Sequence, residues 1–318
     1  GHCGATAAPP NDGTENLSSR EHIMPSHMTN ERNHILRALV AACCLSCAIA
    51  DSAVAAPPDS AQLAEYLDAF IENAVSQDLG PGVAVAVVRG DEVLYLAGHG
   101  CADCEAGVPV TPDTVFYIAS STKSFTGLAA ALLAGRGEID LDAPLSTYLP
   151  MAKLHPQIDA DGVTLRTLLT HTHGIANGGP IVFRTAYSGE HTPELLLELL
   201  PYHGPQRGGP HFEYGNIGFN IASFALDAHL GCSWKDLLDR EIFQPLGMTS
   251  TTGYVSRVSP TALAQPYRVA AEGFERLPYD KCDENMHAAG GLVTTARDLT
   301  RWLQANLTDG RLDGRQVL

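Results

Sequence analysis

The motif Ser120-x-x-Lys123 lies between a short strand-like segment and a long apolar run. Residues three positions apart on a helix share a face, so a helix here places the Lys123 amine within reach of the Ser120 hydroxyl. The run from Phe125 to Leu133 is apolar on every side, which is typical of a buried helix. Burial lowers the pKa of a lysine toward the neutral form that accepts protons. We therefore expect a fold that buries this helix and holds a serine nucleophile beside a basic lysine.

A second motif, Tyr214-Gly215-Asn216, follows about ninety residues after the first. A tyrosine hydroxyl beside an ammonium group loses its proton more easily and can then act as a base. The amide of Asn216 can both donate and accept hydrogen bonds. The structural alternative is a turn in which Gly215 supplies backbone freedom and Tyr214 packs its ring. Either motif alone also occurs by chance, and it is their combination in this order that favours a catalytic site.

Together the two motifs resemble those of the serine β-lactamase and penicillin-binding-protein superfamily, in particular the branch of class C β-lactamases and related esterases and peptidases. Three non-catalytic stretches agree with the resemblance, namely residues 164–174, 245–248 and 289–299. The resemblance extends from about Leu79 to Leu318. It implies an α/β (α+β) fold of the β-lactamase/transpeptidase type, in which helices flank an antiparallel sheet and a helical subdomain is inserted at about residues 138–290.

The resemblance also implies a role for each of four residues. Ser120 would be the nucleophile, Lys123 the proton relay, Tyr214 the general base and Asn216 the residue that orients the substrate. The expected reaction is two-step acyl transfer through an acyl-enzyme on Ser120. The substrate would be an ester or an amide, with β-lactams and D-amino-acid peptides among the candidates. No metal and no cofactor is expected to take part.

The chain departs from the family pattern at two places. His173 stands where the family usually has a small serine, which we interpret as variation beside the site. The third family element, a Lys-Thr-Gly or His-x-Gly stretch on a strand, does not occur up to Leu318, so we expect that element and the last strands of the sheet beyond this residue. In the family this strand supplies one oxyanion donor, and loss of one such donor costs about 100- to 1000-fold in rate. Residues 1–318 alone are therefore expected to be nearly inactive and to fold poorly.

The beginning of the chain has the pattern of an export signal. Within residues 28–55, two arginines precede a short apolar core and an Ala-x-Ala site follows. This core is too short for a stable membrane anchor, so we expect cleavage near Ala56 and export to the periplasm or the extracellular space. Residues 1–27 are predicted to be a disordered upstream extension, and residues 56–318 the hydrolase domain. The alternative to cleavage near Ala56 is lipoprotein processing at Cys43. The structural alternative to a signal peptide is that the apolar run forms a buried core helix.

Composition limits the partners of the chain. The formal net charge is −16, and 45% of the residues are hydrophobic. An acidic chain lacks the basic surface that nucleic-acid binding requires. We therefore expect a small-molecule or peptide substrate and no nucleic-acid partner, and we make no prediction of the oligomeric state.

The cysteines of the expected mature chain are Cys101, Cys104, Cys232 and Cys282. An exported protein can form disulfides, and the two cysteines of the Cys101-x-x-Cys104 motif are the nearest pair. Two readings stay open, a local disulfide or two thiols in a turn. The pairing of the four cysteines is left undecided.

Hydrophobic periodicity and turn residues predict the order of the elements. A capped amphipathic helix is expected from Asp59-Ser60, followed by an antiparallel hairpin and then by the Ser120 helix. Residues 138–290 are expected to be rich in helices and loops, without strong strand signals. The remaining signals are hairpin strands at 82–88 and 92–97, an end of the Ser120 helix at Gly135 and Gly137, and helix starts at Thr192-Pro193, Ser233 and Thr295.

Two other classes of function have some support in the sequence. A zinc hydrolase is suggested by His171-Thr172-His173, but no Asp-His pair follows and the sequence supplies no further ligand. His171 is therefore interpreted as a loop histidine with backbone partners. A non-catalytic penicillin-binding-like or sensor protein would keep the pocket without the chemistry. The presence of all four motif residues argues against it, and the missing third element argues for it.

Overall fold

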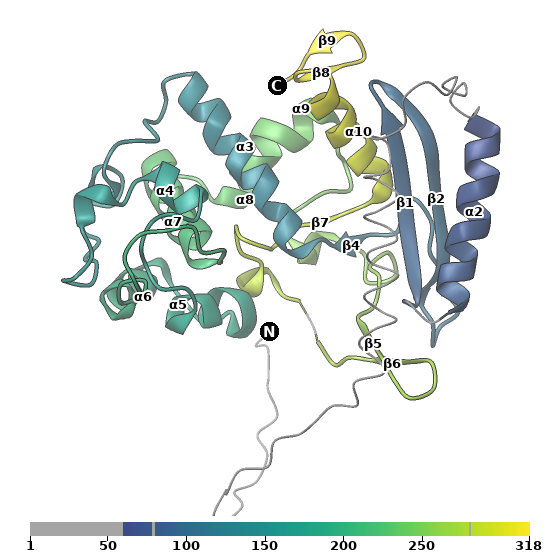
Figure 1. The fold of residues 1–318 in the computed structure, drawn as a ribbon, viewed down its shortest axis with the longest axis horizontal. Helices are drawn as coiled ribbons and strands as arrows, with labels where there is room; N and C mark the ends of the chain where they lie inside the picture. The colour runs from purple at the N-terminus through teal and green to yellow at the C-terminus, as the bar shows by residue number, and fades with distance from the viewer. Residues whose placement is uncertain (1–59, 78–79, 280) are drawn as a thin grey trace, which may run out of the picture. The chain divides into compact units, whose positions relative to one another are not determined.

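The computed structural model describes residues 60–77, 80–279 and 281–318 (Figure 1). The expected upstream extension at 1–27 and the expected signal peptide at 28–55 lie outside the described residues. The helices are α2 (Ser60–Ser76), α3 (Thr122–Gly135), α4 (Leu165–Leu169), α5 (Gly179–Phe183), α6 (Pro193–Leu199), α7 (Ile217–Leu230), α8 (Trp234–Leu238), α9 (Gln244–Leu246) and α10 (Ala296–Leu307). The strands are β1 (Gly82–Arg89), β2 (Glu92–Asp103), β3 (Val108–Pro109), β4 (Phe116–Tyr117), β5 (Tyr267–Val269), β6 (Phe274–Arg276), β7 (Val293–Thr294), β8 (Arg311–Leu312) and β9 (Arg315–Gln316).

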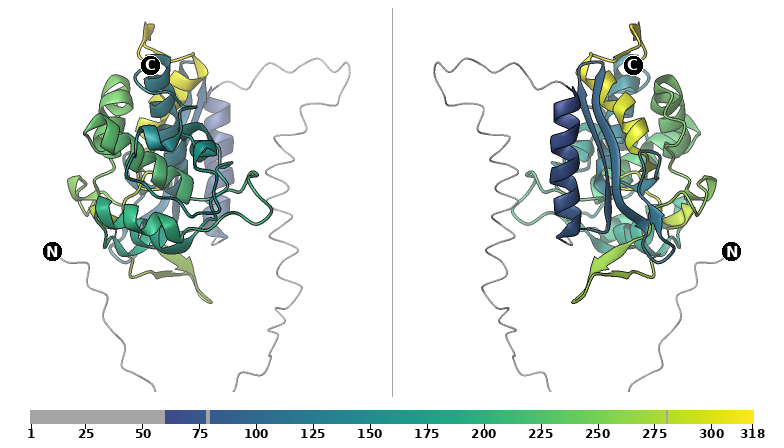
Figure 2. Two further views of the ribbon diagram at one scale, coloured as in Figure 1. Left: turned by 90° about the vertical axis from the view of Figure 1, so that its left-hand side faces the viewer. Right: turned by 90° about the vertical axis from the view of Figure 1, so that its right-hand side faces the viewer.

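The largest sheet has the order β1-β2-β3, and all its strands are antiparallel. The predicted hairpin is confirmed, since β1 pairs with β2 from Gly82 opposite Gly100 to Arg89 opposite Glu92. Gly90 turns the chain between them at a φ of 60°, a value that glycine adopts without strain. Helices α2 and α10 lie on opposite faces of this hairpin (Figures 1 and 2). The antiparallel sheet flanked by helices is thus as expected.

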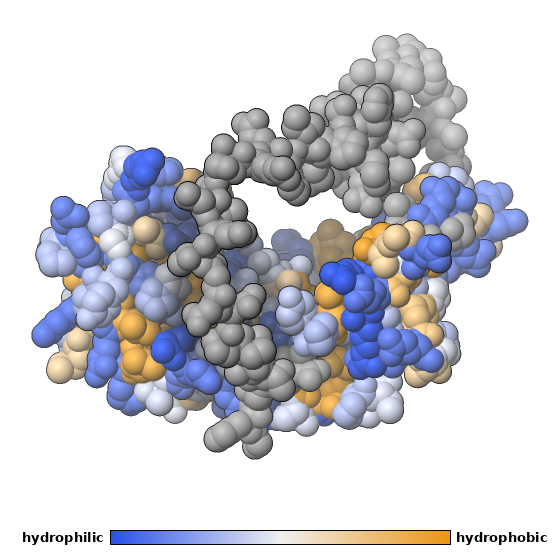
Figure 3. Space-filling model, turned by 90° about the horizontal axis from the view of Figure 1, so that it is seen from below, coloured by the Kyte–Doolittle hydropathy of each residue, from blue (hydrophilic) through white to orange (hydrophobic). Residues whose placement is uncertain are grey.

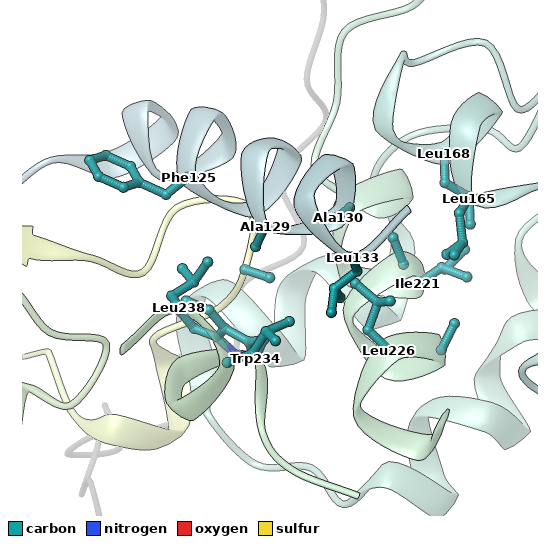
Figure 4. Packing of buried hydrophobic residues seen from close by; sticks show 14 of the residues in the cluster. Phe125, Ala129, Ala130, Leu133, Leu165, Leu168, Ile221, Leu226, Trp234 and Leu238 are labelled. Carbon is teal, nitrogen blue, oxygen red and sulfur yellow. The ribbon is translucent and has the colours of Figure 1, made fainter. Parts of the chain in front are cut away.

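Helix α3 carries the centre of the hydrophobic core (Figure 4). Ala130 and Leu133 are fully buried and point toward residues of α4, α7 and α8. Nearer its start, the Phe125 ring stacks on Trp302 of α10 with the ring centroids 3.9 Å apart. The expectation that the helix is buried on every side is wrong, because Ala131 is exposed. One face of the helix, which includes Ser124 and Ala131, remains toward solvent.

Residues 138–290 are mostly helices and loops, as predicted, but they also contain the hairpin β5–β6. A second unpredicted pairing joins β4 to β7, with Phe116 opposite Thr294 and Tyr117 opposite Val293. Strands of two or three residues are too short to show an alternating pattern, so the sequence carries no signal for them. The β4–β7 pair brings the segment before Ser120 beside the Gly290-Gly291 segment, which positions the site.

The predicted helix starts are confirmed by their caps. The side chains of Thr192, Ser233 and Thr295 each accept a hydrogen bond from a backbone N–H three residues further on. Such caps satisfy donors that have no partner within the first turn of a helix. The bounds of the inserted helical subdomain stay a prediction.

Cys101 and Cys104 form a disulfide, which is one of the two states left open for this pair. Helices of the described segments are all too short or too polar to span a bilayer. On the face shown in Figure 3, hydrophilic residues predominate and apolar residues form separate patches.

Candidate active site

Ser120 lies in a single 3-10 turn, Ala119–Ser121, that joins β4 to α3. The prediction that it belongs to the long helix is therefore wrong by one turn. Side chains three residues apart nearly eclipse each other in a 3-10 turn, so Lys123 at the start of α3 still lies beside it. Ala119 has a φ of +46°, a conformation that costs a non-glycine residue free energy. The sharp turn leaves the Ser120 side chain exposed to solvent.

Lys123 is the buried centre of the site. Its Nζ atom donates to Ser120 Oγ at 3.1 Å, to Asn216 Oδ1 at 2.9 Å and to the Ala289 carbonyl at 2.6 Å. These acceptors and the Tyr214 phenol surround the amine and orient it. Burial lowers the pKa of Lys123, and interaction with Tyr214 only partly offsets this effect. The lysine is thus held in place, and burial shifts its pKa in the direction that the sequence analysis expected.

Tyr214 lies over the ammonium, whose Nζ atom is 5.0 Å from the ring centroid. The phenol is half exposed, with 53% of the residue accessible to solvent. Burial raises the pKa of Tyr214, but hydrogen bonds from Ser120 and Lys123 and the positive charge of Lys123 outweigh it, so the pKa is lowered overall. The structure therefore brings the three side chains that the sequence singled out into one hydrogen-bonded cluster.

Asn216 is the residue that precedes helix α7. Its side-chain oxygen accepts from Lys123, and its backbone N–H donates to Asn177 Oδ1 at 3.1 Å. A Cβ atom on Gly215 would overlap the Asn177 side chain. Close packing, rather than backbone freedom, is therefore the reason for glycine at this position. Asn177 was not predicted, because nothing in its local sequence marks it as a neighbour of residue 216.

The two histidines of the His171-Thr172-His173 stretch pack against the segment that carries Tyr214 and Asn216. The His171 ring lies 4.9 Å from the Tyr214 ring, and its Nδ1 atom accepts from the Gly215 N–H. This contact agrees with the interpretation of His171 as a loop histidine with backbone partners. The pKa of His171 is lowered by burial and by the charge of Lys123. No group of three or more His, Cys, Asp or Glu side chains in the described ranges is placed to hold a metal ion.

His173 is buried beside α7, and its Nδ1 atom accepts from the Ile175 N–H at 3.0 Å. Its Nε2 atom is buried without a hydrogen-bond partner among the described residues. Burial lowers the pKa of His173 to about 4, so the ring is neutral near pH 7. It fills the space beside Gly218, a position at which a Cβ atom would lie 2.8 Å from the ring.

The segment from His287 to Leu292 completes the site, and sequence reasoning gave it no role in the chemistry. Three contacts fasten it to α3: the Ala288 carbonyl accepts from Thr126 Oγ1, the Ala289 carbonyl accepts from Lys123, and the Leu292 N–H donates to Thr122 Oγ1. Gly291 allows the turn, because a Cβ atom there would overlap the backbone of residue 287. The only sequence signal was the Ala-Gly-Gly stretch itself.

This arrangement combines an exposed hydroxyl, a buried amine of lowered pKa and a phenol of lowered pKa. A serine hydroxyl is a weak nucleophile until a neighbouring base takes its proton, and both neighbours here are suited to that task. The geometry is that of a nucleophile with its proton acceptors already in contact.

Comparison with known proteins agrees with this geometry. The family model described as Beta-lactamase matches residues 67–318. Esterase EstB from Burkholderia gladioli is 33% identical over 224 residues, which are 66% of this chain and 56% of that protein. The chain thus spans little more than half the length of this relative.

Solved structures show the same fold. A class C β-lactamase matches with a TM-score of 0.64 and 25% identity, covering 79% of this chain and 67% of that one. The D-amino acid amidase from Ochrobactrum anthropi SV3 matches with a TM-score of 0.62 and 28% identity, and the match covers 80% of this chain and 73% of that one. The chain therefore belongs to the Beta-lactamase family, whose members include serine esterases and amidases, and it has the β-lactamase/transpeptidase-like fold.

Proposed function

We propose that this protein is a serine hydrolase that cleaves an ester or amide bond through an acyl-enzyme on Ser120. The observation that carries the proposal is the contact of 3.1 Å between Lys123 Nζ and Ser120 Oγ, with the Tyr214 phenol in the same cluster. Burial lowers the pKa of the amine, and the hydrogen bonds from Ser120 and Lys123 together with the charge of Lys123 lower the pKa of the phenol. One of the two groups can therefore accept the proton of Ser120. Asn216 is proposed to orient the substrate.

In the first step, Ser120 Oγ attacks the carbonyl carbon while its proton passes to the cluster of Lys123 and Tyr214. The bond to the leaving group then breaks, and the cluster returns the proton to the leaving oxygen or nitrogen. In the second step, water attacks the acyl group and gives a proton to the same cluster. Ser120 Oγ leaves and takes a proton back, which restores the starting state.

The substrate class is proposed at the level of esters and amides. The names of two similar proteins, an esterase and a D-amino acid amidase, support both bond types. Amide cleavage requires protonation of a poorer leaving group, so the proton held by Lys123 and Tyr214 matters more for amides than for activated esters. A panel of 4-nitrophenyl butyrate, nitrocefin and a D-Ala-D-Ala peptide, assayed on the full-length protein, separates the three possibilities.

Ser120→Ala tests the nucleophile. The full-length protein is expected to be labelled by a fluorophosphonate probe at Ser120, and the variant is expected to lose both labelling and turnover. Ser124→Ala is the matched control, since the Ser124 hydroxyl is exposed and donates to the Ser121 carbonyl of its own turn. Turnover by a well-folded Ser120→Ala variant at the wild-type rate would rule out the proposal. Labelling without turnover of any substrate would instead favour the non-catalytic binding protein.

Tyr214→Phe tests the proton acceptor. Because the phenol is half exposed, its removal leaves the fold intact, and kcat/KM is expected to fall about 100-fold or more. A thermal melt and circular dichroism serve as the check on folding. Wild-type kcat/KM in this variant would assign the proton transfer to Lys123 alone.

We also propose that the protein is exported, with residues 28–55 as a cleaved signal peptide, residues 1–27 upstream of it and residues 56–318 in the mature domain. The support is the sequence pattern of arginines, apolar core and small residues. Mass spectrometry of the mature protein from the producing cell is expected to find an N-terminus near Ala56. A lipid-modified N-terminal Cys43 would instead identify a lipoprotein.

A further inference from the structure

The two acceptors that hold Lys123, apart from Ser120, come from separate parts of the chain. Asn216 precedes helix α7, and Ala289 belongs to the turn His287–Gly290, which is closed by the Gly290 N–H donating to the His287 carbonyl at 2.9 Å. Their positions on either side of the Lys123 amine depend on how this turn is fixed to α7. A misplacement of one acceptor would move the amine away from Ser120.

A buried hydrogen bond between side chains makes that connection. His287 Nδ1 and Asn220 Oδ1 are 3.1 Å apart, and the two residues are 7% and 1% exposed. Asn220 lies one turn after Asn216 on α7, where the Asn220 N–H donates to the Asn216 carbonyl at 3.0 Å. The contact therefore ties the turn that carries Ala289 to the helical turn that follows Asn216.

The direction of the bond follows from its neighbours. Thr185 Oγ1 donates its one proton to the Ile181 carbonyl at 2.9 Å, so it can only accept from Asn220 Nδ2, which is 2.7 Å away. This fixes the Asn220 amide with its oxygen toward His287. His287 must then carry its proton on Nδ1 and donate it to Asn220 Oδ1. The nitrogen of the Asn220 side-chain amide thus donates to Thr185 and its oxygen accepts from His287, so both ends of the amide are hydrogen-bonded.

We propose that the hydrogen bond from His287 to Asn220 is a positioning contact of the active site, which sets the separation of the two acceptors around the Lys123 amine. His287 and Asn220 touch neither Ser120 nor Tyr214 in any contact seen in the described part of the chain. They act through the Ala289 carbonyl and through Asn216. This inference rests on the proposed function, since it concerns the amine that serves Ser120.

The charged and titratable groups around the contact are compatible with this role. Burial and the charges of Lys281, Lys123 and His191 lower the pKa of His287 to about 3, so the imidazole stays neutral in the working range of pH. Lys123 itself is faced by Tyr214 and also influences the pKa of His171. Of these groups, the Lys123–Tyr214 cluster is the one whose protonation state governs attack by Ser120.

The test is a pair of substitutions at residue 287 and one at residue 220. His287→Leu and Asn220→Leu each remove the hydrogen bond, whereas His287→Asn keeps an N–H donor close to the position of Nδ1. In the full-length protein, both leucine variants are expected to lose about 10- to 100-fold in kcat with little change in KM. The acid limb of their pH–rate profile is expected to shift by at least about 0.5 pH unit, because the acceptors of Lys123 move. His287→Asn is expected to retain the wild-type profile.

Ser223→Ala is the matched control. It removes a buried hydrogen bond from the same helix, from Ser223 Oγ to the Asn220 carbonyl at 2.8 Å, without touching the bond to His287. If the bond between His287 and Asn220 has only a structural role, all these variants are expected to show a lower melting temperature and an unchanged pH–rate profile. The positioning role predicts a shifted profile in the leucine variants only. If the leucine variants do not fold, Asn220→Ser replaces them, since its shorter side chain cannot bridge Thr185 and His287.

The outcomes separate the two proposals. Absence of fluorophosphonate labelling at Ser120 in the wild-type protein would overturn the proposed function. Wild-type labelling together with unchanged kcat and an unchanged pH profile in folded leucine variants would overturn only the positioning role. A double variant of residues 220 and 287 that is no slower than the slower single variant supports it, whereas full additivity of the two losses contradicts it.

Discussion

Lys123 shows how a single side chain can be both buried and reactive. Its amine is surrounded by acceptors from Asn216, just before α7, and from the Ala289 turn, and it faces the Tyr214 ring. Burial makes the charged form costly, while the acceptors keep the amine oriented toward Ser120 Oγ. The serine and tyrosine side chains remain exposed, so a substrate can reach the cluster although the lysine is covered.

His173 provides a residue-level prediction on pH and stability. Burial lowers its pKa from 6.5 to about 4 in the folded chain. Between these values the unfolded chain binds a proton that the folded chain does not, so the free energy of unfolding falls as the pH falls from about 6.5 to about 4. The loss from this residue is at most about 3 kcal/mol.

The measurement is urea unfolding of wild-type protein and His173→Asn at pH 7 and at pH 4.5. Asparagine does not titrate, and its oxygen can still accept from the Ile175 N–H that now donates to Nδ1. The variant is expected to lose less stability on acidification than the wild-type protein. His287 and His203, whose pKa values burial also lowers, leave a residual slope in both. Equal slopes in the two proteins would show that His173 titrates alike in both states.

At the scale of elements, the packing of α4 against α7 fixes the position of Asn216. Gly218 lies in the first turn of α7, and a Cβ atom there would overlap the Leu168 carbonyl of α4 and crowd His173. The absence of a side chain is therefore what lets the two helices approach so closely. The residue pattern of α7 alone does not reveal this requirement, because the requirement depends on α4.

Two glycine substitutions test this packing. Gly218→Ala is expected to destabilise the protein by about 1–3 kcal/mol and to lower activity, because the start of α7 must shift. Gly127→Ala in α3 is the matched control, since a Cβ atom added there would meet no other atom within 4 Å. It is expected to stabilise the protein by about 0.4–1 kcal/mol, because alanine restricts the unfolded chain. Denaturant melts of both variants give the values, and a neutral Gly218→Ala would contradict the close approach.

At the scale of the whole molecule, the excess of acidic residues is the main electrostatic property. The formal net charge is −16, and ion pairs such as Arg297–Asp113 at 2.6 Å are exposed on both sides. Exposed pairs contribute about 0–1 kcal/mol each, so mutual repulsion of the net charge is expected to outweigh them at low salt.

The melting temperature is therefore expected to rise when NaCl is increased from about 0.01 M to about 0.1 M, which shortens the screening length from about 30 Å to about 10 Å. Differential scanning calorimetry measures the effect. KCl at the same ionic strength is expected to give the same rise, because screening does not depend on the identity of the cation. A melting temperature that falls with salt would mean that local ion pairs outweigh the net repulsion.

Features that depend on neighbours along the chain were predictable. The capping side chains of Thr192, Ser233 and Thr295 act within three residues, and the β1–β2 hairpin is closed by a short turn. The proximity of Ser120 and Lys123 is of the same kind, because a spacing of three places two side chains together in either type of helical turn. For the same reason, the contact between Ser120 and Lys123 was predicted correctly although Ser120 was assigned to the wrong type of turn.

The sequence by itself therefore determined the β1–β2 hairpin, the starts of the capped helices and the family, and it singled out the four residues of the proposed site. Only the tertiary structure decided that the Ala289 carbonyl, 166 residues away along the chain, completes the shell of Lys123, and that His287 bonds to Asn220. A backbone carbonyl has the same chemistry in every residue, and a buried histidine or asparagine has no periodic pattern. Their roles arise from packing between distant segments, which local sequence signals do not encode.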